Sequence, residues 1–79
     1  MTRFYFDLHE CGETLVDEEG IDCTDLAGAR NCALRAARDV MAGEIHDGRL
    51  CLSCHIEVRD DRGVAVATVM FRDAVAVSG

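Results

Sequence analysis

The sequence contains no lysine, no proline and no tryptophan, and it has no long run of apolar residues. Its positive charge comes from eight arginines scattered from Arg3 to Arg72, and the formal net charge is -7. Contacts to nucleic-acid phosphates require clustered basic side chains, so this charge pattern argues against a nucleic-acid partner. The acidity also argues against docking on anionic membranes, and a membrane span would need about 20 consecutive apolar residues.

The first residues do not resemble an export signal. Met1, Thr2 and Arg3 lead directly into an alternating strand pattern rather than a long apolar stretch. We therefore expect a cytoplasmic protein, in which cysteines are kept as thiols. The sequence has five of them: Cys11, Cys23, Cys32, Cys51 and Cys54.

Length and composition predict one small globular domain covering residues 1–79. Hydrophobic residues make up 49% of the chain and charged residues 29%, which is typical of folded proteins. A domain of this size buries only about 60% of the surface that its unfolded chain exposes. Self-association would therefore be a natural source of further burial.

The first part of the chain predicts strands. Residues 3–9 alternate, with Phe4, Phe6 and Leu8 on one buried face. The following segments are predicted as a turn at 10–13, a returning strand at 14–16, an acidic loop at 17–20 and a short extended piece at 21–23. Within the acidic loop, Gly20 is free to adopt a positive φ.

The apolar period changes after Thr24, which predicts an amphipathic helix. Thr24 is expected to be the N-cap, and the helix is expected to run from Leu26 to about Ile45 and to end near Gly48. Its apolar stripe is mostly alanine, which allows close packing on a neighbouring layer. The stripe consists of Leu26, Ala29, Ala33, Ala36, Ala37, Val40 and Met41.

The second half of the chain predicts a β-hairpin. Its segments are a strand at 50–59, a polar turn at 60–63, a strand at 64–71 and a tail at 72–79 with a short turn at Asp73 and Ala74. Pairing of Arg59 with Val64 would place Ala65, Ala67, Val69 and Phe71 on the core face. The predicted fold class is α+β, a two-layer ββαββ arrangement of one antiparallel sheet with the amphipathic helix packed on one face.

The segment Cys51-Leu52-Ser53-Cys54-His55 matches the C-x-x-C-H pattern of c-type haem attachment, and C-x-x-C alone also suggests zinc or redox chemistry. Because it lies in a predicted strand, Cys51 and Cys54 would point to opposite faces of the sheet. Cys51 and His55 would share a face but lie about 13 Å apart, at about 3.3 Å per residue. Zinc requires all its ligand atoms to lie within about 2.3 Å of the ion, so we predict no metal or haem site here.

Two other polar groups are weaker candidates for a metal site. His9 and Cys11, beside the first turn, could meet Cys51 or Cys54 across strands, but a solvated turn is the preferred interpretation. The carboxylates at 17–19 could attract a hard cation, but they lack the spaced oxygen ligands of a calcium loop. A solvated acidic loop is therefore expected there.

The outer face of the sheet, away from the helix, is the best candidate for a functional surface. Catalysis by a pair such as Ser53 and His55 would need a cleft and an orienting third group, so we expect no enzyme and assign no catalytic, cofactor-binding or metal-binding residue. Apolar groups exposed among polar ones favour a partner surface, covered by a second copy or by another protein. The candidate residues are Tyr5, His9, His55, Val64, Val66 and Met70.

Several segments carry a family resemblance through their order and spacing. They are RFYFDLH, DEEG, DLAGARNCALRAARDVMAGEI, IEVRDDRG and ATVMFRDAV, within about residues 3–75. Together they resemble a family of small uncharacterised bacterial proteins, the domain of unknown function 6894 family. The resemblance implies a stand-alone α+β domain and supplies no activity, cofactor or catalytic residue. The family pattern before IEV does not carry C-x-x-C-H, which implies that this segment is not a shared functional site.

These observations predict a small cytoplasmic binding or interaction module that is non-enzymatic and homodimeric. One alternative is a metal-binding or redox-responsive protein that uses its cysteines and histidines. Another is an antitoxin-like regulator, because small antitoxin domains of the HicB type also place an acidic, glycine-containing turn and a short strand before an alanine-rich helix. The likeness to these antitoxin domains concerns the fold alone.

Overall fold

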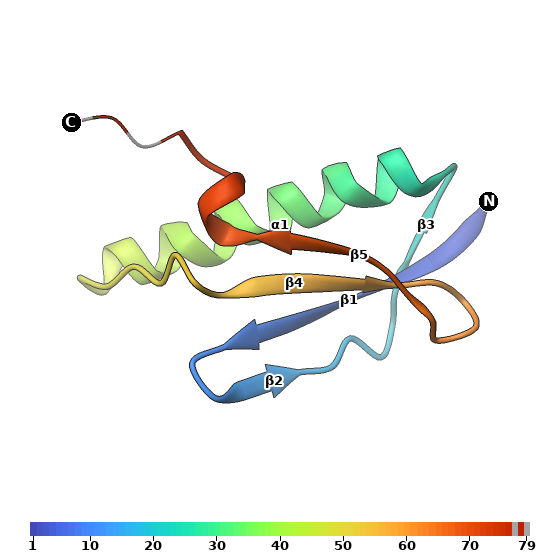
Figure 1. Ribbon diagram of the computed structural model, residues 1–79, viewed down its shortest axis with the longest axis horizontal. Coiled ribbons are helices and arrows are strands. Elements are labelled where there is room, and N and C mark those ends of the chain that lie inside the picture. Colours follow the sequence, from blue (N-terminus) through green and yellow to red (C-terminus); the bar gives the residue numbers. More distant parts are fainter. Residues whose placement is uncertain (77, 79) are drawn as a thin grey trace.

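A computed structural model describes residues 1–76 and residue 78 as one antiparallel sheet with a single long helix packed on it (Figure 1). The α+β prediction is confirmed. The elements are β1 (Thr2–Glu10), β2 (Glu13–Leu15), β3 (Ile21–Cys23), α1 (Leu26–His46), β4 (His55–Arg59), β5 (Ala65–Met70) and the 3-10 helix η1 (Phe71–Asp73). The predicted extended piece before the helix is a true strand, so the sheet has five strands.

Strand β1 is the centre of the sheet. It pairs with β4 through residues Tyr5 to His9, and the strand order is β2-β1-β4-β5. The short strands β2 and β3 pair with its two ends, β3 at Thr2 to Phe4 and β2 at Leu8 to Glu10. All these pairings are antiparallel, so the end of β1 lies beside the beginning of β4 (Figure 1).

The acidic loop between β2 and β3 is exposed at Glu18 and Glu19, as predicted, but its Asp17 side chain bonds to the sheet. The Asp17 carboxylate accepts the backbone N–H of Phe6, at 3.1 Å, on the edge of β1 between its pairings with β3 and β2. Its other oxygen accepts the N–H groups of Glu19 and Gly20. Gly20 adopts a φ of 73°, as predicted. A buried backbone donor must find a partner, and here a side chain supplies it.

Helix α1 begins at Leu26, as predicted, but its N-cap lies one residue later than expected. The N-cap is Asp25, whose carboxylate accepts the Gly28 N–H at 2.8 Å, and not Thr24. Both residue types cap helices well, so their order in the sequence could not decide between them. The alanine part of the predicted stripe is confirmed, because Ala29, Ala33 and Ala37 are fully buried, but its first member, Leu26, is exposed.

The core lies between the helix stripe and the inner face of the sheet. Its largest fully buried side chains are Ile56, Val58 and Phe71. The small side chains of the helix allow close approach to these larger ones, as expected for a close-packed interior. None of the described helices is long and apolar enough to cross a membrane.

The hairpin of β4 and β5 departs from the predicted register. Arg59 pairs with Ala65, not Val64, and Val58 pairs with Ala67, so one extra residue bulges at this point. Asp60 causes the shift, because its carboxylate accepts the Arg62 and Val64 N–H groups at 2.9 Å. The bulge moves Ala65 from its predicted core face to the outer face, opposite Arg59, where it is exposed. Ala67 and Val69, beyond the bulge, keep their predicted core face.

The beginning of the predicted tail packs against the helix. Phe71 and Ala74 are buried, and the Arg38 side chain donates to the Ala74 carbonyl. The predicted turn at Asp73 and Ala74 coincides with the end of η1. Two positions of the tail, 77 and 79, lie outside the described residues, and the predicted domain boundary at 79 is among them.

Candidate functional site

The C-x-x-C segment is a bent loop, so the prediction of a strand from residue 50 is wrong. Strand β4 begins only at His55, where the β1–β4 ladder ends in the pair of His55 with His9. The Cα atoms of Cys51 and Cys54 are 5.8 Å apart. Extended chain would separate them by about 10 Å. The two side chains therefore meet instead of pointing apart, and they form a disulfide bond.

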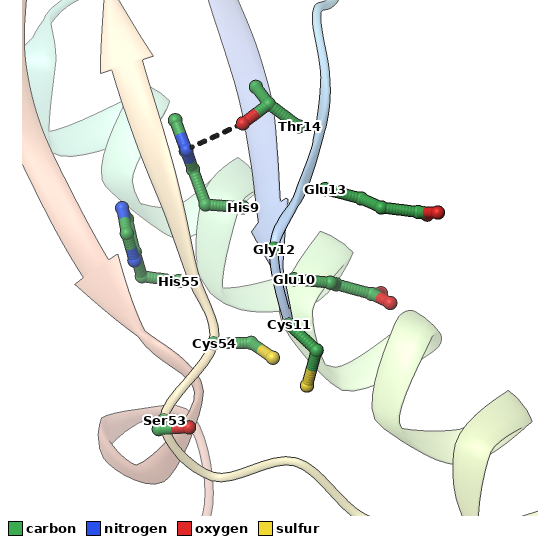
Figure 2. Close-up of a pocket in the computed structure, with 9 residues that line it drawn as sticks. All are labelled: His9, Glu10, Cys11, Gly12, Glu13, Thr14, Ser53, Cys54 and His55. Atoms are coloured by element: carbon green, nitrogen blue, oxygen red, sulfur yellow. Dashed lines mark hydrogen bonds between the residues drawn. The ribbon is translucent and has the colours of Figure 1, made fainter.

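Cys11 approaches this disulfide from the turn between β1 and β2. Its Sγ lies 3.5 Å from Cys51 Sγ, and the sulfurs of Cys11, Cys51 and Cys54 all lie within 4.8 Å of one another. Figure 2 shows the side chains of Cys11 and Cys54 directed toward each other. Cys11 is exposed, as expected of a turn, but the turn is not simply solvated. Antiparallel pairing of β1 with β4 brings these distant segments to one end of the sheet.

A second cluster lies beside the sulfurs on the outer sheet face. The rings of His9 and His55 are stacked, with centroids 4.5 Å apart and an angle of 8° between their planes. Thr14 Oγ1 lies 3.2 Å from His9 Nδ1, and Glu57 Oε2 lies 3.8 Å from His9 Nε2. The two rings stand side by side in Figure 2. The alternating sequence pattern predicted that both histidines lie on this face. It did not indicate that their rings are in contact, because that contact depends on the strand register.

A pocket of about 420 Å³ joins the two clusters. Its walls come from the β1–β2 turn and from the start of β4 (Figure 2). The lining residues are His9, Glu10, Cys11, Gly12, Glu13, Thr14, Ser53, Cys54 and His55. Ser53 Oγ lies 3.5 Å from Cys51 Sγ, so its described partner is a sulfur and not the His55 ring.

Farther along the outer face, Asp7 and Arg59 form a partly buried ion pair. Arg59 donates two hydrogen bonds to the Asp7 carboxylate, at 2.6 and 3.1 Å, and lies over the Tyr5 ring. Asp17 N–H donates to the same carboxylate at 2.9 Å. Arg59, more than the backbone donor, holds the pKa of Asp7 below its usual value against the opposing effect of burial. Arg59 and Asp17 thus cover the outer sheet face around Asp7. The sequence pattern did not indicate this covering.

The residues of the predicted interaction surface fall into separate places. His9, His55 and Met70 form one cross-strand row, since His55 pairs with both others. Tyr5 lies under Arg59, at the other end of the β1–β4 ladder. The remaining two, Val64 and Val66, lie at the start of β5 and are 52% and 37% exposed.

Two further thiols lie away from the pocket. Cys23 is buried in β3, and Cys32 is half-buried on α1. Burial, and then the neighbouring Cys32 thiol, raise the pKa of the Cys23 thiol. A raised pKa means less thiolate at neutral pH and a slower reaction with electrophiles. Reactive sulfur is therefore expected mainly at Cys11.

The comparison with protein families agrees with the fold just described. The model of one family, "Domain of unknown function (DUF6894)", matches residues 3–72. The chain belongs to this family. The match covers α1, strands β2 to β5 and all of β1 except Thr2, so it confirms the resemblance seen in the sequence while assigning no activity to DUF6894. No curated protein and no solved structure matches the chain significantly.

Proposed function

We propose that the protein is a redox-responsive interaction module in which Cys11, Cys51 and Cys54 exchange one disulfide bond. The proposal is carried by the 3.5 Å separation between Cys11 Sγ and Cys51 Sγ, at a point where Cys51 is bonded to Cys54. Attack of a thiolate on a disulfide sulfur is the general route of such exchange. In the cytoplasm, the location we propose, disulfides are mostly transient and redox-sensing.

The exchange is balanced within the chain and needs no outside oxidant. The Cys11 thiolate attacks Cys51 Sγ, a Cys11–Cys51 bond forms, and the Cys51–Cys54 bond breaks. Cys54 leaves as a thiolate and takes up a proton. Cys11 is exposed whereas Cys54 is buried, so a solution disulfide such as oxidised glutathione reaches the cluster mainly through the Cys11 thiol.

The exchange would change the rim of the pocket between the β1–β2 turn and the loop before β4. Cys11 belongs to the turn and Cys51 to the loop, so a bond between them ties the two segments together. A bond between Cys51 and Cys54 leaves the turn unattached. We therefore propose that the position of the disulfide bond controls which partner this end of the sheet binds, with no catalytic role for the protein.

The test is peptide mapping of the disulfides in glutathione buffers, after free thiols are blocked with acid and alkylating agent. Trypsin cleaves after arginine, which places Cys11 in peptide 4–30 and Cys51 in peptide 50–59. The exchanged state therefore appears as a cross-link between these two peptides. Cys23 shares the first peptide, so the experiment is carried out in a Cys23→Ala background.

The Cys54→Ser variant isolates the new bond. Cys11 and Cys51 should join within one chain in oxidised glutathione, while Cys11→Ser should retain only the Cys51–Cys54 bond. Cys32→Ser is the matched control and should behave as the parent. Absence of the 4–30 to 50–59 cross-link in both the parent and Cys54→Ser would overturn the proposal.

A second candidate function is self-association through the start of β5. Val64 and Val66 are exposed at the edge of the described sheet, where an apolar patch favours a partner. Light scattering after gel filtration should give a dimer for the parent and a monomer for Val64→Lys with Val66→Lys. Ala42→Lys, on the exposed side of α1, should stay dimeric. A strictly monomeric parent would contradict this candidate.

A further inference from the structure

We infer that His9, His55 and Glu57 form a binding site for a divalent transition-metal ion on the outer face of the sheet. One ligand atom from each side chain lies within 4.8 Å of the others. No cysteine belongs to this site. The inference therefore goes beyond the proposed thiol exchange and is tested independently of it. Two imidazoles and a carboxylate suit zinc, copper or nickel better than magnesium or calcium.

The sheet itself brings the three ligands together. His9 and His55 are directly opposed in the β1–β4 ladder, so their side chains leave the same face. Glu57 is two residues beyond His55, which returns its side chain to that face. The β1–β4 register and the alternation of side chains along β4 therefore position the cluster, and it does not depend on a mobile loop.

Among the described residues, His9 Nε2 is a polar atom whose hydrogen-bonding capacity is not used. The atom is buried and has no hydrogen-bond partner among the described residues, and Glu57 Oε2, at 3.8 Å, is beyond hydrogen-bond distance. With the proton on Nδ1, which then donates to Thr14 Oγ1, Nε2 carries a free lone pair beside the carboxylate. Such a bond from the second ring nitrogen is the usual way in which proteins orient a metal-binding histidine.

Binding an ion requires the two stacked rings to rotate, because the lone pair of each ring nitrogen lies in the plane of its own ring and the two planes are nearly parallel. Two ligand atoms that each lie about 2.1 Å from one zinc ion are about 3.4 Å apart in tetrahedral geometry. The ligand atoms here lie within 4.8 Å of one another, and the His9 and Glu57 side chains are about one-third exposed. Rotation of the stacked rings can close this difference. Three protein ligands leave a fourth position open toward the solvent side of the face.

The experiment uses the full chain carrying Cys11→Ser, with the Cys51–Cys54 bond kept oxidised so that the sulfur cluster offers no thiolate. Calorimetric titration with Zn²⁺ should give one site per chain, and Ca²⁺ should give none. Bound Co²⁺ should show visible bands without thiolate charge-transfer absorption. A thiolate band or the absence of any Zn²⁺ binding would overturn the inference.

Variants then assign the ligands. Glu57→Gln and His55→Gln should each abolish the calorimetric signal, with circular dichroism confirming that the chain stays folded. Thr14→Val should weaken Zn²⁺ binding about 10- to 100-fold, because it removes the partner that orients His9. His46→Gln, at the exposed end of α1, is the matched control and should bind as the parent does. Unchanged binding in Glu57→Gln and His55→Gln would place the ion elsewhere.

Discussion

Asp7 is a carboxylate that is buried on the outer face of the sheet. Its side chain accepts hydrogen bonds from Arg59 and from the Asp17 N–H, and Asp17 in turn accepts the Phe6 N–H. One residue thus links β1, β4 and the acidic loop. A buried carboxylate with these partners is strongly favoured in its charged form.

We predict that Asp7→Asn destabilises the fold by about 2–3 kcal/mol at pH 7, because Arg59 keeps its charge and loses its partner. The pKa of Asp7 is lowered in the folded state, so its stabilising effect is complete above the unfolded pKa of about 3.9. The effect disappears as pH falls through the lower folded pKa. Urea unfolding from pH 7 to pH 2 should show the two proteins converging below about pH 4.

Asp61→Asn is the control for this series, since Asp61 is an exposed residue of the adjacent turn. It should follow the parent at every pH. A constant difference between Asp7→Asn and the parent down to pH 2 would contradict the role assigned to the ion pair.

Gly20 and Gly63 offer a matched pair of backbone tests. Both have positive φ, at 73° and 81°, which costs an L-residue about 1–2 kcal/mol. A Cβ at Gly20 would lie 2.8 Å from the Phe4 carbonyl oxygen, whereas a Cβ at Gly63 meets nothing within 4 Å. Gly20→Ala should therefore lower the free energy of unfolding clearly more than Gly63→Ala. Equal losses in urea denaturation would show that the contact with β1 is unimportant.

Among the elements, α1 owes its close packing to small side chains. Ala29, Ala33 and Ala37 recur every four residues and are fully buried against the sheet. We predict that Ala33→Leu costs about 1–3 kcal/mol through overpacking. Ala42→Leu, on the exposed side of the same helix, should change stability by less than about 0.5 kcal/mol. Thermal unfolding of both variants checks the prediction, and a neutral Ala33→Leu would contradict it.

The alternating and helical periods were sufficient to predict β1, α1 and the core face of β4 and β5. They failed at residues 50–54, where alternation continues beyond the end of the β1–β4 ladder, so local pattern and pairing disagree. The candidate functional site includes residues of this segment, where the predicted strand was wrong. Its sulfurs and histidines come from segments about 40 residues apart, as Cys11 and Cys51 are. Such contacts depend on register, which a single sequence does not specify locally.

For the whole molecule, the disulfide is expected to be dispensable for folding. Cys51 and Cys54 are separated by three positions, so their bond closes a very short loop and stabilises by about 2 kcal/mol in the chain-entropy account. Reduction should lower the unfolding temperature modestly and leave the circular dichroism spectrum unchanged at room temperature. A Cys51→Ser, Cys54→Ser double variant should match the reduced parent. Unfolding upon reduction would contradict this expectation.

The central position of β1 has a consequence for the order of events during synthesis. Its main partner is β4, and the Asp7 and Arg59 side chains that join these strands are 52 residues apart in the chain. While the ribosome is still producing α1, β1 has only the two short strands β2 and β3 as neighbours. The sheet can close only after β4 has emerged, so we expect this domain to fold late relative to the synthesis of β1, at the slower rates of structures rich in distant contacts.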